Sequence, residues 1–202
     1  AWIVRENDEQ SNPTSYEDYP NPEAQLVTLQ LKKGGHSSGM LTLDKTEEQG
    51  TETLIDDYSI AGADLAKAVL SKNRLLYITP KLQADLHISG VPKISVKVAS
   101  DKAAVNLSIW LVSLPWNDGS EAKITDNIIT RGWADPQNYK SLTESEPMKK
   151  GKFYEVAFEL MPDDQIISAG QQIGLLIFSS DKEFTLHPKP GTQLTLDFDG
   201  TM

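Results

Sequence analysis

The sequence predicts an all-β protein, a β-sandwich of the jelly-roll type with one short helix in its N-terminal part. From residue 74 to the end, apolar side chains recur at every second position, which is the period of a β-strand. Turn-forming segments separate these tracts: SGVP, NDG, MPDD, SAGQQ and PKPG. Repeated strands with one apolar face and almost no helix indicate two antiparallel sheets packed face to face.

The chain begins with a polar, irregular region. Residues 7 to 25 contain three prolines and no periodicity, which predicts an extended surface segment. Residues 26 to 31 alternate, with Val27, Leu29 and Leu31 on one face, and this pattern predicts a strand. The next features expected along the chain are a Gly/Ser-rich loop at 34–39, a short strand at 40–43 and a solvated turn at 45–52.

One segment has the period of a helix. In residues 61 to 73 the apolar side chains that share one helical face are Leu65, Ala66, Val69 and Leu70. The change from this pattern to the strand period predicts two parts: a connecting region over residues 1–73 and a sandwich over residues 74–202.

The strands expected in the second part follow one another closely. Four tracts have a single apolar face, at residues 94–98, 105–111, 154–160 and 194–198. Residues 173 to 180 are apolar on both faces, which predicts a central strand of a sheet.

Composition excludes several classes of partner. The net charge is −10 and the isoelectric point is near 4.7, so neither a nucleic acid nor an anionic membrane surface is an expected partner. The chain has no cysteine, which is compatible with a reducing compartment, and we expect a cytoplasmic location. It opens with neither an initiator Met nor a signal-peptide pattern, and we expect it to be a piece of a longer protein.

A G-x-S-x-G pattern at Gly35, Ser37 and Gly39 raises the question of a serine hydrolase. A nucleophile of that kind needs a strand before the serine and a helix after it. The residues after the loop alternate as a strand does, so we expect Ser37 to lie in a surface turn and predict no catalytic residue.

No metal or cofactor site is predicted. The three histidines are far apart and lack the spacing of metal ligands on a helix. Three acidic pairs could offer oxygen ligands to calcium, but they are interpreted as solvated turns because no EF-hand-like loop surrounds them. These pairs are Asp56 with Asp57, Asp163 with Asp164, and Asp197 with Asp199.

Three tryptophans could form a platform for sugar rings, namely Trp110, Trp116 and Trp133. Packing in a core or an interface is the preferred interpretation. Trp110 falls on the polar phase of its strand, which predicts that it is either exposed or covers a sheet face under another domain. A carbohydrate-binding module is therefore the alternative function.

Several segments together resemble a known family. They are residues 76–82 (LYITPKL), 88–92 (ISGVP), 94–112, 130–138 (TRGWADPQN) and 169–181 (AGQQIGLLIFSSD). In this order the chain, over about residues 74–200, resembles the C-terminal domain of X-prolyl dipeptidyl aminopeptidases, and more loosely that of cocaine-esterase-like hydrolases. The first 73 residues resemble the region that leads out of the catalytic domain of these enzymes.

The resemblance implies a jelly-roll sandwich like those of galactose-binding modules. It also implies a parent enzyme, an α/β-hydrolase serine peptidase that releases X-Pro dipeptides from peptide N-termini and is a homodimer. Its Ser-Asp-His triad would lie upstream, so the partner implied for this chain is the catalytic domain of the same protein. Peptide substrate would be met only through the parent enzyme.

The stretch from residue 131 to 138 is the predicted contact with that catalytic domain. Arg131, Trp133, Asp135 and Asn138 are its candidate interface residues, since arginine and tryptophan are frequent interface anchors. The alternative is a local pair between Arg131 and Asp135 that stabilises a turn.

Overall fold

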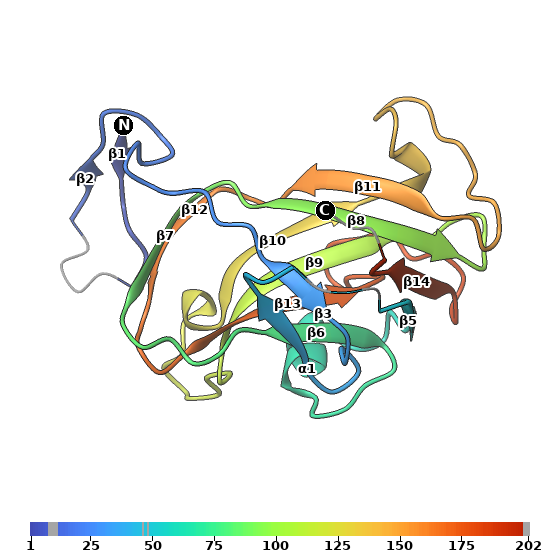
Figure 1. Cartoon of the computed structure of the whole chain (residues 1–202), viewed down its shortest axis with the longest axis horizontal. Helices are drawn as coiled ribbons and strands as arrows, with labels where there is room; N and C mark the ends of the chain where they lie inside the picture. Colours follow the sequence, from blue (N-terminus) through green and yellow to red (C-terminus); the bar gives the residue numbers. More distant parts are fainter. Residues whose placement is uncertain (8–11, 46, 48, 200–202) are drawn as a thin grey trace.

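The computed structural model describes residues 1–7, 12–45, 47 and 49–199. The chain is mostly β, with several sheets and one short α-helix (Figure 1). Part of the predicted extended segment (8–11) and part of the predicted turn (46 and 48) lie outside the described residues. No helix in the described ranges has the length and apolar character needed to cross a membrane.

Two larger sheets make up most of the structure. The six-stranded sheet has the order β10-β9-β13-β6-β4-β3, and its strands are β10 (Ile128–Ala134), β9 (Leu107–Leu114), β13 (Gln172–Phe178), β6 (Arg74–Ile78), β4 (Gly39–Thr42) and β3 (Gln30–Lys32). The four-stranded sheet has the order β11-β8-β14-β5, with β11 (Tyr154–Glu159), β8 (Lys93–Ser100), β14 (Gln193–Asp197) and β5 (Thr51–Ile55). Within these sheets β4 and β6 pair in parallel, and the other described pairs are antiparallel.

Two small two-stranded sheets complete the strand inventory. β7 (Leu86–Gly90) pairs with β12 (Asp163–Ile167), and β1 (Trp2–Ile3) pairs with β2 (Thr14–Ser15). Figure 1 shows the β7–β12 ribbon curving away from the two larger sheets toward β1 and β2. The remaining elements are α1 (Gly62–Lys67) and two 3-10 turns, η1 (Ile124–Asp126) and η2 (Pro136–Asn138).

The two larger sheets face each other across one apolar core. Its fully buried side chains come from both sheets, as Val98 and Leu196 do on one side and Ile109 and Ile177 on the other. The alternation seen in the sequence therefore has its physical cause in this core, because every second side chain leaves water. The prediction that residues 173–180 form a central strand is confirmed: β13 lies between β9 and β6.

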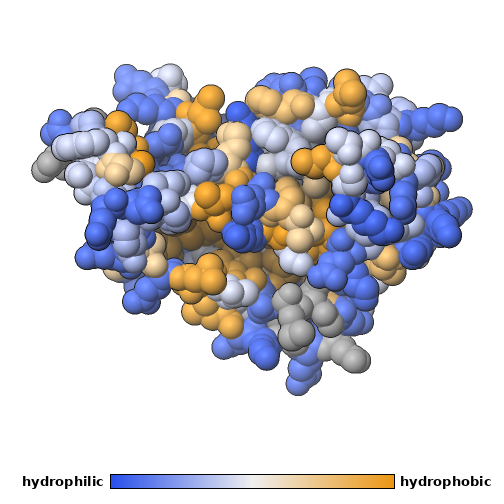
Figure 2. Space-filling model, turned by 90° about the horizontal axis from the view of Figure 1, so that it is seen from above, coloured by the Kyte–Doolittle hydropathy of each residue, from blue (hydrophilic) through white to orange (hydrophobic). Residues whose placement is uncertain are grey.

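The core is covered less completely at its margin. Half-buried apolar side chains pack against it there, namely Leu29, Leu31, Leu82, Ile88, Ile94 and Phe158. Seen from above, apolar side chains surround a hollow in the middle of the surface, between hydrophilic shoulders (Figure 2).

Strands from the first 73 residues belong to both large sheets. β3 and β4 extend the six-stranded sheet beyond β6, and β5 pairs with β14 at the edge of the four-stranded sheet. The division after residue 73 stays a prediction, and a boundary at that place would cut through both sheets.

The predicted helix over 61–73 is wrong in length. α1 ends at Lys67, because Ala68 is extended with φ −62° and ψ 126°. Only part of the expected apolar face is buried: Leu65 packs against the sheet, whereas Val69 and Leu70 are 89% and 73% exposed. The strand predicted over residues 26–31 is likewise shorter, since β3 begins at Gln30.

A buried arginine ends the helix. Arg74, the first residue of β6, is 0% exposed and its guanidinium donates hydrogen bonds to the carbonyls of Leu65 and Ala68 at the end of α1. The same guanidinium donates to the carbonyls of Gly35 and Ser37 in the Gly/Ser-rich loop. Helix-terminal carbonyls that lack an intrahelical partner are thus paired by a side chain.

The hydrogen bonds from Arg74 to the loop also fix the position of Ser37. The residue lies in the loop between β3 and β4, its side chain is exposed, and its hydroxyl donates to the carbonyl of Gly34 at 3.3 Å. The strand–loop–strand context predicted for Ser37 is confirmed, and no helix follows it as a nucleophile elbow requires.

We predict that Arg74→Met lowers the free energy of unfolding by about 3 kcal/mol, because buried carbonyls lose their donors and cannot regain water. Urea unfolding would measure this loss. Lys72→Met is the matched control, since Lys72 is exposed two residues away, and we expect a change within about 0.5 kcal/mol. Equal effects of the two substitutions would contradict the role given to Arg74.

Candidate functional site

The N-terminal segment lies along the β7–β12 ribbon. The backbone N–H of Glu6 donates to the carbonyl of Asp164 at 2.8 Å, and the N–H of Ile166 donates to the carbonyl of Glu6 at 3.1 Å. Glu6 thereby forms a parallel bridge with Gln165 and adds a short third strand to the ribbon. We call residues 1–7 together with 12–23 the strap.

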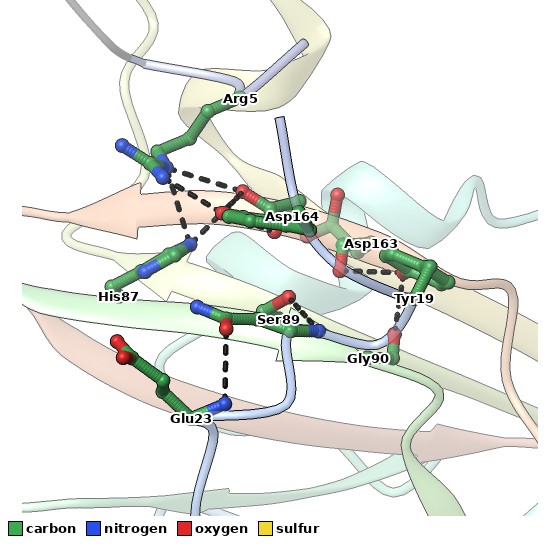
Figure 3. Close-up of polar contacts among 10 residues, drawn as sticks. Arg5, Tyr19, Glu23, His87, Ser89, Gly90, Asp163 and Asp164 are labelled. Atoms are coloured by element: carbon green, nitrogen blue, oxygen red, sulfur yellow. Dashed lines mark hydrogen bonds and ion pairs between the residues drawn. The ribbon is translucent and has the colours of Figure 1, made fainter. Parts of the chain in front are cut away.

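A buried carboxylate holds the strap on the ribbon (Figure 3). Asp164 is 5% exposed, and its Oδ1 atom lies 3.2 Å from Nε of Arg5 and 2.9 Å from Nε2 of His87. Tyr16 closes the network: its hydroxyl accepts from Nη2 of Arg5 at 2.7 Å and lies 3.2 Å from Oδ2 of Asp164. Residues distant in sequence are therefore joined at one charged centre.

The strap is attached to the ribbon a second time through Tyr19. Its hydroxyl lies within hydrogen-bond distance of two carbonyls, that of Asp163 at 3.0 Å and that of Gly90 at 3.2 Å. The backbone N–H of Asn21 reaches the hydroxyl of Ser89 at 3.4 Å. These contacts fix the course of the strap along the ribbon (Figure 3).

The two neighbouring aspartates titrate in opposite directions. Burial raises the pKa of Asp163 to about 7, with a further contribution from the negative charge of Glu6. One oxygen of Asp163, Oδ2, is buried and has no hydrogen-bond partner among the described residues. Burial would also raise the pKa of Asp164, but hydrogen bonds from Ser89 and His87 outweigh it and the pKa is lowered.

A second cluster lies on the outer face of the six-stranded sheet. Arg131 on β10 pairs in register with Trp110 on β9, and both side chains lie on the face of the sheet that α1 covers at Trp110. A buried carboxylate connects the two tryptophans of the cluster: Oδ2 of Asp181 accepts from Nε1 of Trp110 and from Nε1 of Trp133, each at 3.0 Å. Asp181 itself is 1% exposed.

Aromatic rings surround the guanidinium of Arg131. Its Cζ atom is 4.1 Å from the ring centroid of Phe184 and 5.7 Å from the ring centroids of Trp110 and Trp133. Trp133 and Phe184 stack on each other with centroids 5.3 Å apart. We call Trp110, Arg131, Trp133, Asp181 and Phe184 the aromatic cluster.

The structure separates the four predicted interface residues into two pairs. Arg131 and Trp133 lie together in the aromatic cluster. Asp135 instead accepts from the N–H of Gln137 at 2.9 Å and caps η2, and Asn138 donates to the carbonyl of Ser141 at 3.0 Å. No ion pair joins Arg131 to Asp135 within the described ranges, which argues against the alternative of a local pair.

The three tryptophans are buried or half-buried, which argues against a platform for sugar rings. Trp110 is 5% exposed, because the polar phase of its strand faces α1 and Leu65 packs there. Trp116 is half-buried against the same outer-face cluster. Trp110 is therefore neither exposed nor covered by another domain, because α1 of the same chain covers it.

The interpretation of the acidic pairs as solvated turns is wrong for two of them, since Asp56 and Asp164 are 3% and 5% exposed, and the pairs have protein partners. Asp56 accepts from the N–H and the hydroxyl of Ser180, and Asp197 accepts from Nζ of Lys97 at 2.7 Å. Among the residues with described positions, no group of three or more histidine, aspartate or glutamate side chains is arranged to hold a metal ion.

Sequence reasoning missed Arg5, Tyr16, Asp181 and Phe184. Arg5 and Tyr16 stand in the irregular N-terminal region, where no periodicity marks them. Asp181 closes a segment that carried the family resemblance, and this position is the one signal that could have drawn attention to it.

Comparison with known proteins shows what this chain is similar to. The family model of the X-Pro dipeptidyl-peptidase C-terminal non-catalytic domain matches residues 1–201. A candidate Xaa-Pro dipeptidyl-peptidase of Rhodopirellula baltica is 53% identical over 201 residues, which cover 100% of this chain and 32% of that protein. The Xaa-Pro dipeptidyl-peptidase of Lacticaseibacillus rhamnosus is 26% identical over 232 residues, covering 96% of this chain and 28% of that protein. The chain thus spans about a third or less of the length of these relatives.

Two solved structures have a similar fold. An aminopeptidase from a marine sediment thaumarchaeon superposes with a TM-score of 0.72 at 12% identity, over 95% of this chain and 37% of that one. A CocE/NonD family hydrolase of Staphylococcus aureus superposes with a TM-score of 0.65 at 12% identity, over 96% of this chain and 38% of that one. At this identity the likeness concerns the fold alone.

We predict that Asp163→Asn changes the pH dependence of stability. The pKa of Asp163 is about 7 in the folded chain and about 3.9 when unfolded, so the folded state binds more protons between these values and stability falls as pH rises through them. Relative to the wild type, the variant should gain stability from about pH 4 to about pH 7 and keep that gain above pH 7. Urea unfolding across this range would measure it.

The control for this prediction is Glu144→Gln, which removes a carboxylate from an exposed position. A difference between Asp163→Asn and the wild type that stays constant with pH would contradict the raised pKa.

Proposed function

The chain belongs to the X-Pro dipeptidyl-peptidase C-terminal non-catalytic domain family, and from this membership we propose that it is part of a serine peptidase. That enzyme would release X-Pro dipeptides from peptide N-termini. The observation that carries the proposal is the family match over residues 1–201 in a chain that covers 32% of its Rhodopirellula baltica relative. The remaining length of such a protein has room for an α/β-hydrolase domain that holds the triad.

For the fold we propose the jelly-roll type, similar to galactose-binding modules. Two features support this: a six-stranded and a four-stranded sheet enclose one core, and the pairing is antiparallel except at β4–β6. The boundary proposed after residue 73 would then mark a connecting region whose short strands are incorporated into the sandwich.

The role that we propose is docking: the sandwich packs on the catalytic domain and shapes access to its active site. The aromatic cluster supports this role, because Phe184 is 48% exposed next to an arginine and a half-buried tryptophan. Tryptophan and arginine dominate the binding energy of many interfaces. Asp135 and Asn138 would contribute by fixing the turn that follows β10.

For the parent protein we further propose a cytoplasmic location and a homodimeric state. The absence of cysteine is compatible with the first, and the family resemblance supports the second. Neither proposal assigns dimer contacts to this chain.

The first prediction concerns catalysis. The 202-residue chain should give no turnover of a chromogenic Ala-Pro amide, whereas the full-length protein should cleave it, because the nucleophile lies outside this chain. A spectrophotometric assay of both proteins at equal concentration measures this. Turnover by the short chain that disappears in Ser37→Ala would overturn the proposal.

The second prediction concerns docking. In the full-length protein, the double substitution Arg131→Ala with Trp133→Ala should lower kcat/KM several-fold and lower the melting temperature. The control is Lys93→Ala, which removes an exposed cation from the opposite sheet. Kinetics and melting equal to the wild type in the double variant would contradict docking through this surface.

A further inference from the structure

The chain has three arginines, and two of them are fully engaged. Arg74 donates to four backbone carbonyls in the interior. Arg5 of the strap contacts Tyr16 of the strap, and Asp164 and His87 of the β7–β12 ribbon. Both satisfy the rule that a guanidinium withdrawn from water is paired or hydrogen-bonded.

Arg131 differs from these two. Its side chain is half-buried, yet it has no hydrogen bond and no ion pair with any residue that the structure describes. Its contacts are with the faces of three aromatic rings. The carboxylate of its own cluster is occupied elsewhere, because Asp181 accepts from the indoles of Trp110 and Trp133.

Hydrogen bonds position the neighbours of Arg131. Phe184 lies in a tight turn in which the N–H groups of Phe184 and Thr185 donate to the carbonyl of Asp181 at 3.1 and 3.0 Å. The hydroxyl of Thr185 also accepts from the N–H of Asp181 at 2.9 Å. The turn thus keeps the phenyl ring over the guanidinium, and Asp181 keeps the indole of Trp133 beside it.

Stacking uses the faces of a guanidinium and leaves its N–H donors on the edge. Five donors in a planar fork match the two oxygens of a carboxylate, and such a bidentate pair is stronger than a neutral hydrogen bond. Holding the guanidinium in place beforehand reduces the entropy lost on binding. The geometry is therefore that of a receptor for an anionic group.

The surface around Arg131 favours a protein carboxylate over a free ion. Phe184 is 48% exposed and its ring centroid lies 4.1 Å from Cζ of Arg131, so an exposed apolar side chain lies next to the cation. An apolar rim contributes little to a small solvated anion but is buried when a protein surface covers it.

We propose that the Arg131 guanidinium, held against Phe184 and beside Trp133, binds an aspartate or glutamate side chain of the catalytic domain in the full-length protein. The inference rests on the proposed docking function and adds to it the chemistry of the contact. The carboxylate would form two parallel N–H···O bonds with Arg131 while Phe184 becomes covered.

The test uses the full-length protein and two substitutions of Arg131. Arg131→Met keeps an apolar stem and removes the charge, and Arg131→Lys keeps the charge and removes the fork. Thermal unfolding is measured at low salt and at about 1 M NaCl, where the Debye length falls to about 3 Å. The control is Lys152→Met, since Lys152 is an exposed cation 5.0 Å from the ring centroid of Tyr154.

We expect Arg131→Met to lower the melting temperature by about 3 °C at low salt, with at least half of that loss absent at high salt. Arg131→Lys should lie between Met and wild type, because a point charge retains part of the attraction. Lys152→Met should change the melting temperature by less than about 1 °C in either condition.

Other outcomes separate this inference from docking itself. The double substitution of Arg131 and Trp133 can have its expected effect while Arg131→Met lowers the melting temperature equally at both salt concentrations. In that case docking is supported, and the proposed contact with a carboxylate is contradicted. If the double substitution has no effect on kinetics or melting, docking through this surface is contradicted, and the carboxylate contact that rests on it is contradicted as well.

The source of the carboxylate is tested by kinetics. Substrate could supply the anion through its C-terminus, so KM is compared for an Ala-Pro amide and for an Ala-Pro peptide with a free C-terminal carboxylate. The proposal expects Arg131→Met to act equally on both. A KM that rises only for the free carboxylate would assign the contact to substrate and overturn the proposal.

Discussion

The packing of this protein depends on how one buried guanidinium is paired. Arg74 begins β6, is withdrawn from water, and binds backbone carbonyls of the Gly/Ser-rich loop and of α1. An ion in such a position is stable only when its donors are satisfied, so the loop and the end of the helix must both converge on it. The next residue on the opposite face of β6, Leu75, belongs to the core between the sheets. One strand therefore ties the loop, the helix and the core together.

The inner end of the same loop is held by a second buried group. Glu52 accepts from the N–H groups of Gly34 and Gly35 at 3.1 and 3.2 Å, and from the hydroxyl of Tyr77 at 2.7 Å. Burial, followed by the hydrogen bond to Glu52, raises the pKa of Tyr77. A side chain at Gly35 would meet Leu75 and Tyr77 at 2.8 Å, so the glycine is required by close approach. The G-x-S-x-G match thus has a packing cause, which explains why it occurs without a nucleophile elbow.

Two other buried carboxylates also join segments that are far apart in the sequence. Asp164 joins the strap to the β7–β12 ribbon, and Asp181 joins two indoles beside β10. Each carboxylate is nearly fully buried and satisfied by donors from segments far apart in sequence. In the proposed full-length protein, the strap follows the catalytic domain in the chain. The aromatic cluster is the proposed contact with that domain. The outer surface of the sandwich would then be fixed to its partner at a covalent connection and at a docking site.

The sequence by itself determined the all-β class, the central position of residues 173–180, the family, and the placement of Ser37 in a loop between strands. The family rests on the resemblance of particular segments, and the other features rest on the two-residue period and on local turn chemistry, which neighbouring residues determine. Only the tertiary structure decided that α1 stops at Lys67, because its terminal carbonyls are bound by Arg74 rather than by a further helical turn. It alone showed that α1 covers Trp110, and that Arg131 stacks on Phe184, a residue on another segment. Such contacts join side chains through space, and no local pattern in a single chain records which distant residue will meet which.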